Sequence, residues 1–215
     1  MGHESDTVIY EYYAKRILEE TFPERYQNLR KSERPDLVSE SGIGIEVTQA
    51  CDKTIKEAEG FFHKFMNKTP QEIGGKNLAF SKRIFEEEDV YLFFNGKLAA
   101  FSPPAHWVTI EQLKEAYCKK IEKLQTYRAC SKNELFIFDS GYNSYELSEV
   151  EQFSEWINQA TDRNLLTFDA VYVRSNGKLY RCEPSSLKVD EYEVDTDAFG
   201  DLKQEAAVFA AQSDI

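Results

Sequence analysis

The sequence predicts one mixed α/β domain, in which a hairpin begins a central sheet and helices cover that sheet. Three observations favour this class. Apolar residues recur at helical spacing in several long segments. The continuous apolar run ELFIFDS, Glu134–Ser140, is typical of a strand at the centre of a sheet. Two Asn-Gly dipeptides, Asn95-Gly96 and Asn176-Gly177, are typical of tight turns between antiparallel strands.

The first expected elements are a helix and then a hairpin. The apolar residues of Thr7–Phe22 fall on one stripe at helical spacing, and Pro23 ends this helix. Residues Gln27–Glu33 are polar and basic, which favours a connection or a short edge strand. The next segment, RPDLVSESGIGIEVTQA from Arg34 to Ala50, has the β-branched residues and the glycines of a hairpin.

The middle of the chain combines a helix with a segment of mixed character. Residues Cys51–Asn67 carry apolar side chains at helical spacing. Residues Thr69–Gly75 contain a proline and two glycines, which predicts a loop. Residues Leu78–Ala105 contain an acidic run, an apolar run and the first Asn-Gly turn. We therefore expect residues 70–105 to be an insertion.

The clearest predicted helix covers Thr109–Arg128. Thr109 can cap its first turn, with Gln112 as the partner in a capping box. One stripe of this helix is apolar, and we expect its lysines to lie away from that stripe. The residues of the stripe are Leu113, Ala116, Tyr117, Ile121, Leu124 and Tyr127, and the lysines are Lys114, Lys119, Lys120 and Lys123.

The remaining elements complete the sheet. A helix is predicted for Leu147–Ala160, and Phe168–Pro184 is expected to form a hairpin around the second Asn-Gly turn. Residues 185–215 are an acidic C-terminal extension. We found no internal repeat, so residues 1–215 are expected to form a single domain.

Composition indicates a soluble globular protein. Hydrophobic residues make up 41% of the 215 residues and charged residues 30%, so that a core can form. No apolar run reaches the about 20 residues that a membrane helix needs. The N-terminal MGHESDTVIYEYY lacks the basic and apolar regions of a signal peptide. We therefore expect a cytoplasmic protein without membrane contact.

Charge and metal-binding residue types narrow the function classes. The net charge of −12 argues against a nucleic-acid partner, although a local basic stripe can dominate over a Debye length of about 8 Å. The scattered cysteines are expected to be reduced, and the chain has only 3 histidines, which disfavours a zinc site. A metal would instead bind carboxylate oxygens, which favours a hard ion such as Mg²⁺. The cysteines are Cys51, Cys118, Cys130 and Cys182.

Two acids inside the first hairpin are the main candidates for chemistry. A three-residue turn, Glu40-Ser41-Gly42, would use a positive φ at its glycine and would pair Asp36 with Glu46. Alternation then places Asp36, Glu46 and Thr48 on one face of the sheet. The other face is apolar and is expected to pack into the core. Its residues are Leu37, Ile43, Ile45 and Val47.

The pairing of these two carboxylates needs a physical explanation. Like charges across a ladder repel each other, and burial should raise the pKa of one carboxyl group. A divalent cation would remove both costs, and it could activate water and stabilise charge on a phosphate. Gly44 is expected to leave open space beside the carboxylates. The alternative is a solvent-exposed sheet face that merely tolerates two acids.

The pattern Pro35-Asp36, nine residues and then Glu46 resembles the PD-(D/E)XK nuclease superfamily. The resemblance covers the motif and the order of elements from Glu11 to Ser140. It implies a restriction-endonuclease-like core, with a mixed central sheet that a hairpin starts and helices flank. It also implies an endonuclease or a related hydrolase that cleaves phosphodiester bonds of nucleic acid, with DNA as the expected substrate.

The same resemblance implies a metal site and a supporting glutamate. Mg²⁺, or Mn²⁺ as its substitute, would bind Asp36, Glu46 and the carbonyl of Val47. Members of the superfamily often add a glutamate from the first helix. Glu11 is the best match, because its spacing from later apolar residues points it toward packed neighbours. Glu20 is the second choice, and an ordinary solvated helix acid is the alternative for either residue.

The resemblance departs at Thr48, where the superfamily usually has lysine. That lysine orients the water and stabilises developing negative charge, whereas threonine has no charge. We count Thr48 as a candidate catalytic residue that helps to place water or a phosphate oxygen. Some members recruit a lysine from a nearby helix, and Lys53 and Lys56 follow the strand directly. These two could also be ordinary solvated lysines, and catalysis could also be lost.

Two further groups could serve a site. The four lysines of the Thr109–Arg128 helix could line a phosphate-binding cleft, or they could form i,i+4 pairs with Glu115 or Glu122. Asp139 ends the apolar strand, where an acid can serve a site or cap a turn.

The sequence thus leaves three hypotheses. The first is a Mg²⁺-dependent nuclease that acts on DNA, alone, as a homodimer or with a protein partner. The second is a catalytically inactive nuclease-like module with a binding or regulatory role, which the missing lysine and the acidic charge favour. The third is an immunity-type or nucleic-acid-mimic protein with an acidic surface for a basic partner. We rank the third last, because the acids are spread over most helices.

Overall fold

The computed structural model describes residues 3–77, 91–101, 107–126, 130–141, 145–164, 167–194 and Phe209. The chain divides into two compact units. Unit 1 contains His3–Ala50 and Val108–Ile215, and unit 2 contains Cys51–Trp107. We expected one domain of residues 1–215 with an insertion of residues 70–105. The insertion lies inside unit 2, which begins earlier because the helix after Ala50 packs on the core of unit 2.

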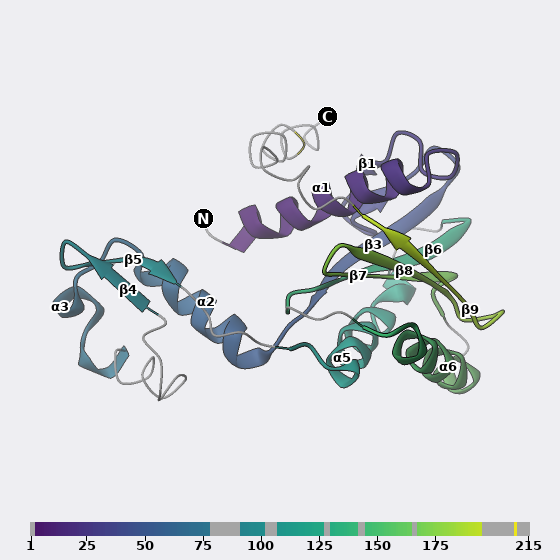
Figure 1. Cartoon of the computed structure of the whole chain (residues 1–215). Helices are drawn as coiled ribbons and strands as arrows, with labels where there is room; N and C mark the ends of the chain where they lie inside the picture. Colours follow the sequence, from purple (N-terminus) through teal and green to yellow (C-terminus); the bar gives the residue numbers. More distant parts are fainter. Residues whose placement is uncertain are drawn as a thin grey trace. The chain divides into compact units, whose positions relative to one another are not determined.

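Unit 1 is a mixed α/β unit, as predicted. Within the described residues its sheet has seven strands in the order β1-β2-β3-β6-β7-β8-β9 (Figure 1). β3, β6 and β7 are parallel to one another at the centre, and the outer pairs are antiparallel. The strands are β1 (Arg30–Lys31), β2 (Leu37–Val38), β3 (Ile43–Ala50), β6 (Lys132–Asp139), β7 (Ala170–Ser175), β8 (Lys178–Glu183) and β9 (Lys188–Glu193).

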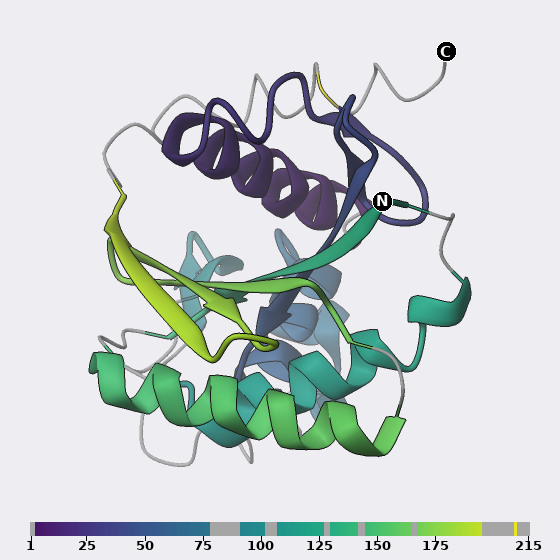
Figure 2. The ribbon, with the colours of Figure 1, turned by 90° about the vertical axis from the view of Figure 1, so that its right-hand side faces the viewer.

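Helices cover both faces of this sheet. α1 (His3–Thr21) lies on one face, and α5 (Ile110–Ile121) and α6 (Leu147–Asn164) lie on the other (Figure 2). Each layer has its own apolar core, because strand residues alternate between the two faces. Ile17 and Leu18 of α1 belong to the cluster of Ile45 and Phe136. Leu113 of α5 and Phe153 of α6 belong to the cluster of Ile137 and Val171.

The first hairpin has the predicted turn and register. The N–H of Ser39 donates to the carbonyl of Ile43 at 2.9 Å, so residues 40–42 form the turn. Gly42 has a φ of 81°, which glycine adopts without steric cost. β2 and β3 then pair Leu37 with Ile45, and Ile45 and Val47 are buried under α1. The face assignment of the hairpin is therefore confirmed.

The space beside Gly44 is filled, and our expectation of open space there was wrong. A Cβ on Gly44 would lie 2.5 Å from Cγ of Pro35 and 2.8 Å from Sγ of Cys130. Both neighbours come from segments that border the hairpin, so the absent side chain allows the motif proline to pack directly on β3.

The other predicted elements of unit 1 are present with changed ends. Thr109 and Gln112 form the predicted capping box. The following helix ends at Ile121 and continues as a 3₁₀ turn, Leu124–Thr126. The hairpin at Asn176-Gly177 is confirmed, with φ values of 40° and 81°. Of the expected extension 185–215, Lys188–Glu193 is strand β9, and residues 195–208 and 210–215 lie outside the described residues.

The described part of unit 2 includes helices α2 and α3 and a two-stranded sheet. Thr69 caps the short helix α3 inside a segment that we expected to be a loop. The first Asn-Gly hairpin is confirmed. Phe61, Ile73 and Leu98 form the core of this unit. The elements are α2 (Lys53–Phe65), α3 (Pro70–Ile73), β4 (Tyr91–Phe94) and β5 (Lys97–Phe101).

Among the described residues, no helix has the length and apolar content that crossing a membrane requires.

Candidate functional site

Asp36 and Glu46 meet at the end of the first hairpin. Continuing the β2–β3 register by one residue places Asp36 opposite Glu46, on the face that α5 covers. Oδ2 of Asp36 accepts a hydrogen bond of 2.7 Å from the N–H of Val47, which fixes this carboxylate against β3. Glu46 is 6% exposed. The two acids are therefore sheltered and close together, instead of lying on a solvent-exposed sheet face.

This arrangement makes ionisation of Asp36 unfavourable. Its pKa is raised from 3.8 to about 6, chiefly by burial and then by the negative charge of Glu46. The N–H of Val47 and the charges of Lys120 and Lys31 oppose this rise. A bound cation would offset both the cost of burying the Asp36 carboxylate and its repulsion by Glu46.

Glu11 of α1 belongs to the same group of charges. It is 6% exposed, and burial and the charge of Asp36 raise its pKa from 4.5 to about 7. Glu46 contributes to that rise, and Lys31 opposes it from β1, with Nζ 3.9 Å from Oε2 of Glu11. Glu20, our second choice, is half exposed and forms a 2.5 Å ion pair with Arg16. Glu11 is therefore the glutamate of the first helix that the structure brings to the acids.

Another buried carboxylate shows how a satisfied one differs from Glu11. Glu134 is fully buried, forms an ion pair with Arg25 and accepts a hydrogen bond from the hydroxyl of Tyr26. Oε2 of Glu11, by contrast, is buried without a hydrogen-bond partner in the described part of the chain. Buried polar atoms are normally paired, so this oxygen is a candidate for contact with a ligand.

Lys120 of α5 places a positively charged side chain beside Glu46, whereas Thr48 has no charge. Its Nζ lies 2.5 Å from Oε1 of Glu46, and its side chain is 19% exposed. Our expectation that the α5 lysines lie away from the apolar stripe was wrong for this residue. Lys120 comes three residues after Tyr117 and four after Ala116, which are both buried. That spacing is the signal that could have predicted an inward position.

The other candidate lysines make ordinary helix contacts. Nζ of Lys114 lies 2.5 Å from Glu111, and Lys119 pairs with Glu115 at 3.9 Å. In unit 2, Lys53 is 90% exposed and pairs with Glu57 at 3.9 Å, and Lys56 is exposed as well. The exposed pairs of Lys119 and Lys53 contribute little to stability. Lys114 is 22% exposed, and its Nζ lies 5.4 Å from the ring centroid of Trp156.

Thr48 and Val47 border the acids on β3. Thr48 is half-buried and shares the face of Glu46, two residues further along the strand. The carbonyl of Val47 points to the same side as its N–H, which donates to Asp36. The continued register places Pro35 opposite Val47, and proline has no N–H to donate to that carbonyl. Both positions can therefore face a ligand of the carboxylates.

Asp139 has a structural role at the end of β6. Its Oδ1 accepts from the N–H of Gly141 at 2.7 Å, and its Oδ2 accepts from Oγ of Ser175 at 2.8 Å. The turn after β6 is thereby capped, which is one of the two roles that the sequence allowed.

The donors present fit a hard divalent cation. In the described residues, no group of three or more His, Cys, Asp and Glu side chains could hold a metal. Two carboxylates and a carbonyl are nevertheless a suitable set for Mg²⁺, which usually binds one or two carboxylates together with waters and substrate phosphate. The raised pKa of Asp36 and the missing hydrogen bond at Oε2 of Glu11 also fit a position for positive charge.

Comparison with known proteins adds no family to this description. No protein-family model, no curated protein and no solved structure matches the chain.

Proposed function

We propose that this protein is a Mg²⁺-dependent nuclease that hydrolyses phosphodiester bonds of nucleic acid in the cytoplasm. One observation carries the proposal. Glu46 is buried and Asp36 is half-buried, the charge of Glu46 acts on Asp36, and the ammonium group of Lys120 lies 2.5 Å from Glu46. Two carboxylates and one lysine are the functional groups of the PD-(D/E)XK motif, here with the lysine on a helix instead of on the strand. The restriction-endonuclease-like core is part of the same proposal.

The residues divide the chemistry between them. Asp36, Glu46 and the carbonyl of Val47 would hold Mg²⁺ or Mn²⁺, which supplies a polarised water and stabilises charge on the phosphate. Lys120 orients the attacking water and neutralises charge on the scissile phosphate, because its position at Glu46 matches the role of the motif lysine. Thr48 can donate its hydroxyl to water or to a phosphate oxygen. DNA as the substrate comes from the resemblance.

Glu11 assists as a carboxyl group that can gain or lose a proton close to the acids. Its raised pKa, about 7, allows it to exchange a proton near neutral pH. Lys31 balances its charge from the neighbouring strand. A cation bound at Asp36 and Glu46 would lower this pKa and favour the ionised form of Glu11. Glu11 is therefore assigned a supporting role.

Cleavage assays test the proposal directly. Purified protein is incubated with supercoiled plasmid and with single-stranded DNA, in millimolar Mg²⁺ and in EDTA. We expect cleavage only with the metal, and none by Asp36→Ala or Glu46→Gln. Glu40→Gln is the matched control, because Glu40 lies in the same hairpin but is exposed and pairs with Arg30. Full cleavage by Asp36→Ala would exclude this site.

A second candidate function is a catalytically inactive binding module. The observation that favours it is the Glu46–Lys120 ion pair, which neutralises the carboxylate without any metal. Calorimetric titration with Mn²⁺ distinguishes the two. Binding heat that disappears in Asp36→Ala supports the nuclease, whereas no heat in millimolar Mn²⁺ supports the inactive module.

A further inference from the structure

Unit 1 contains a pocket that the proposed metal site does not use. It lies on the α1 side of the sheet, where β6 and β7 end, and has a volume of about 370 Å³. That volume is within the range of about 300–1,000 Å³ that is usual for small-molecule sites. Its walls come from α1, from the turn after β6 and from β7. The residues that matter here are Tyr10, Tyr13, Phe138, Asp139 and Arg174.

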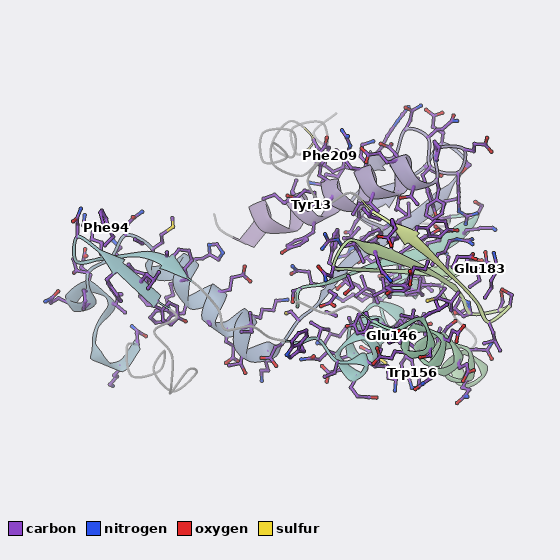
Figure 3. The ribbon with its side chains drawn as sticks, viewed as in Figure 1. Tyr13, Phe94, Glu146, Trp156, Glu183 and Phe209 are labelled. Carbon is purple, nitrogen blue, oxygen red and sulfur yellow. The ribbon has the colours of Figure 1, made fainter. Side chains whose placement is uncertain are left out.

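Aromatic side chains form one wall of the pocket. The rings of Tyr10 and Phe138 are 5.2 Å apart between centroids and tilted by 58°. The ring of Tyr13, labelled on α1 in Figure 3, lies 6.5 Å from that of Phe138. Tyr10 and Tyr13 are three residues apart on α1 and so project toward the same region. Such a corner offers ring faces and edges to a flat ligand.

Two charged residues, Arg174 and Asp139, also line the pocket. Arg174 is half-buried at the end of β7, and its Nε is buried without a hydrogen-bond partner within the part of the chain that the structure describes. Burial lowers the pKa of Arg174, and Asp139, Tyr13 and Tyr10 oppose that change. The oxygens of Asp139 already accept hydrogen bonds from Ser175 and Gly141. The guanidinium therefore has donor capacity for a ligand with acceptor groups.

We propose that this pocket binds one unpaired nucleobase of the nucleic-acid substrate. The flat π face of a base can stack on the rings of Tyr10 and Tyr13. The acceptor atoms on its edge can receive hydrogen bonds from Arg174. The nearby Asp139 leaves the wall with one positive and one negative group, which favours a neutral base over a free phosphate. The pocket is thus assigned to single-stranded or locally unpaired substrate.

Helix α1 connects this pocket to the carboxylates. Tyr10 lines the pocket, and the next residue, Glu11, is buried with its Oε2 3.9 Å from Nζ of Lys31. This inference rests on the proposed function for the choice of nucleic acid, but base binding itself needs no metal.

The test measures base binding in EDTA, so that cleavage plays no part. The probe is a short single-stranded oligonucleotide with one 2-aminopurine, whose fluorescence is quenched when the base stacks. We expect quenching by the wild type, and at least tenfold weaker binding to Arg174→Gln and to Tyr13→Leu. Arg30→Gln is the control, because it removes the same charge from unit 1 at a position that is 76% exposed. Circular dichroism checks that each variant is folded.

The outcomes separate this inference from the proposed function. Quenching that depends on Arg174 supports the pocket even if the protein cleaves nothing. Cleavage of DNA without quenching overturns the pocket and leaves the nuclease in place. Equal binding of an oligonucleotide with an abasic site at the probe position, or full competition by millimolar inorganic phosphate, also overturns the base pocket and indicates an anion site.

Discussion

The position of Lys120 is the main difference between this chain and the motif that it resembles. A lysine at position 48 would lie on the same face of β3 as Glu46, and the structure instead brings Lys120 to Glu46 from α5. Charge at one point in space can come from either element, since only the location of the ammonium group matters to the phosphate. The ammonium group therefore comes from α5 instead of from β3, and substitutions at Lys120 and Thr48 can test its role.

We expect Lys120→Ala to lower the rate of DNA cleavage by about 10²–10³-fold, because a preorganised charge at the phosphate is lost. The double variant Lys120→Ala, Thr48→Lys should recover a large part of that rate, since it restores the motif lysine on the strand. Lys119→Ala is the matched control, as Lys119 is 75% exposed and pairs with Glu115. Single-turnover kinetics measure the effect. An unchanged rate in Lys120→Ala would contradict the role of this lysine.

Glu11 makes stability depend on pH in a defined direction. The pKa of Glu11 is about 7 in the folded protein and 4.5 when the side chain is fully solvated, as in the unfolded chain. The folded state therefore binds more protons than the unfolded state between these two pH values. Stability must then fall as pH rises from about 4.5 to 7, by about 2–3 kcal/mol for this group. Glu11→Gln removes this contribution.

Melting curves without divalent metals test this effect. Relative to wild type, Glu11→Gln should gain several °C in Tm at pH 8 and little at pH 4.5, at about 2–4 °C per kcal/mol. Glu20→Gln is the control from the same helix, because Glu20 is half exposed and paired with Arg16. Parallel pH profiles for wild type and Glu11→Gln would show that Glu11 is not the buried acid described above.

At the scale of elements, the hairpin positions the acids through close backbone packing. Pro35 packs where a side chain of Gly44 would lie, and Pro35 is followed directly by Asp36. The conformation of the carboxylate pair therefore depends on an absent Cβ at one position in β3. A small substitution there should disturb the fold and the site together.

We expect Gly44→Ala to cost about 1–3 kcal/mol of stability through overpacking and to weaken Mn²⁺ binding. Gly60→Ala is the matched substitution. Gly60 lies inside helix α2, and the Cβ of an alanine there would have no other atom of the described structure within 4 Å. It should be neutral or stabilising by about 0.5–1 kcal/mol. Melting curves and Mn²⁺ calorimetry measure both. Normal Mn²⁺ binding by Gly44→Ala would show that the position of the two acids does not depend on the packing of Pro35 against Gly44.

At the scale of the whole molecule, the two units differ in the size of their cores. Unit 1 has two large apolar clusters on the faces of its sheet, whereas the described core of unit 2 consists of Phe61, Ile73 and Leu98 with a few partly buried neighbours. A small core buries too little apolar surface to be very stable. The two units should therefore open independently.

Hydrogen exchange followed by mass spectrometry can compare the two units. Amides of α2 and β5 should exchange faster than those of β6, and Leu98→Ala should accelerate exchange in unit 2 while leaving β6 unchanged. Ile137→Val, in the core of unit 1, should accelerate exchange in β6 and leave the exchange of unit 2 unchanged. Equal protection of α2 and β6 would indicate one cooperative unit.

Local patterns in the sequence were sufficient for most of the elements and for the turn of the first hairpin, but not for α3 or β9. Helical spacing, the capping box at Thr109 and the Asn-Gly turns act between near neighbours, so they were predicted correctly. The strand period of two was enough to predict the pairing of Leu37 with Ile45, from which the position of Asp36 beside Glu46 follows. The pairing of Glu46 with Lys120, which is 74 residues away, depended on how α5 packs on β3. The filling of the space at Gly44, the extent of unit 2 and the pocket beside Arg174 also required tertiary contacts, because each brings together segments that no local pattern relates.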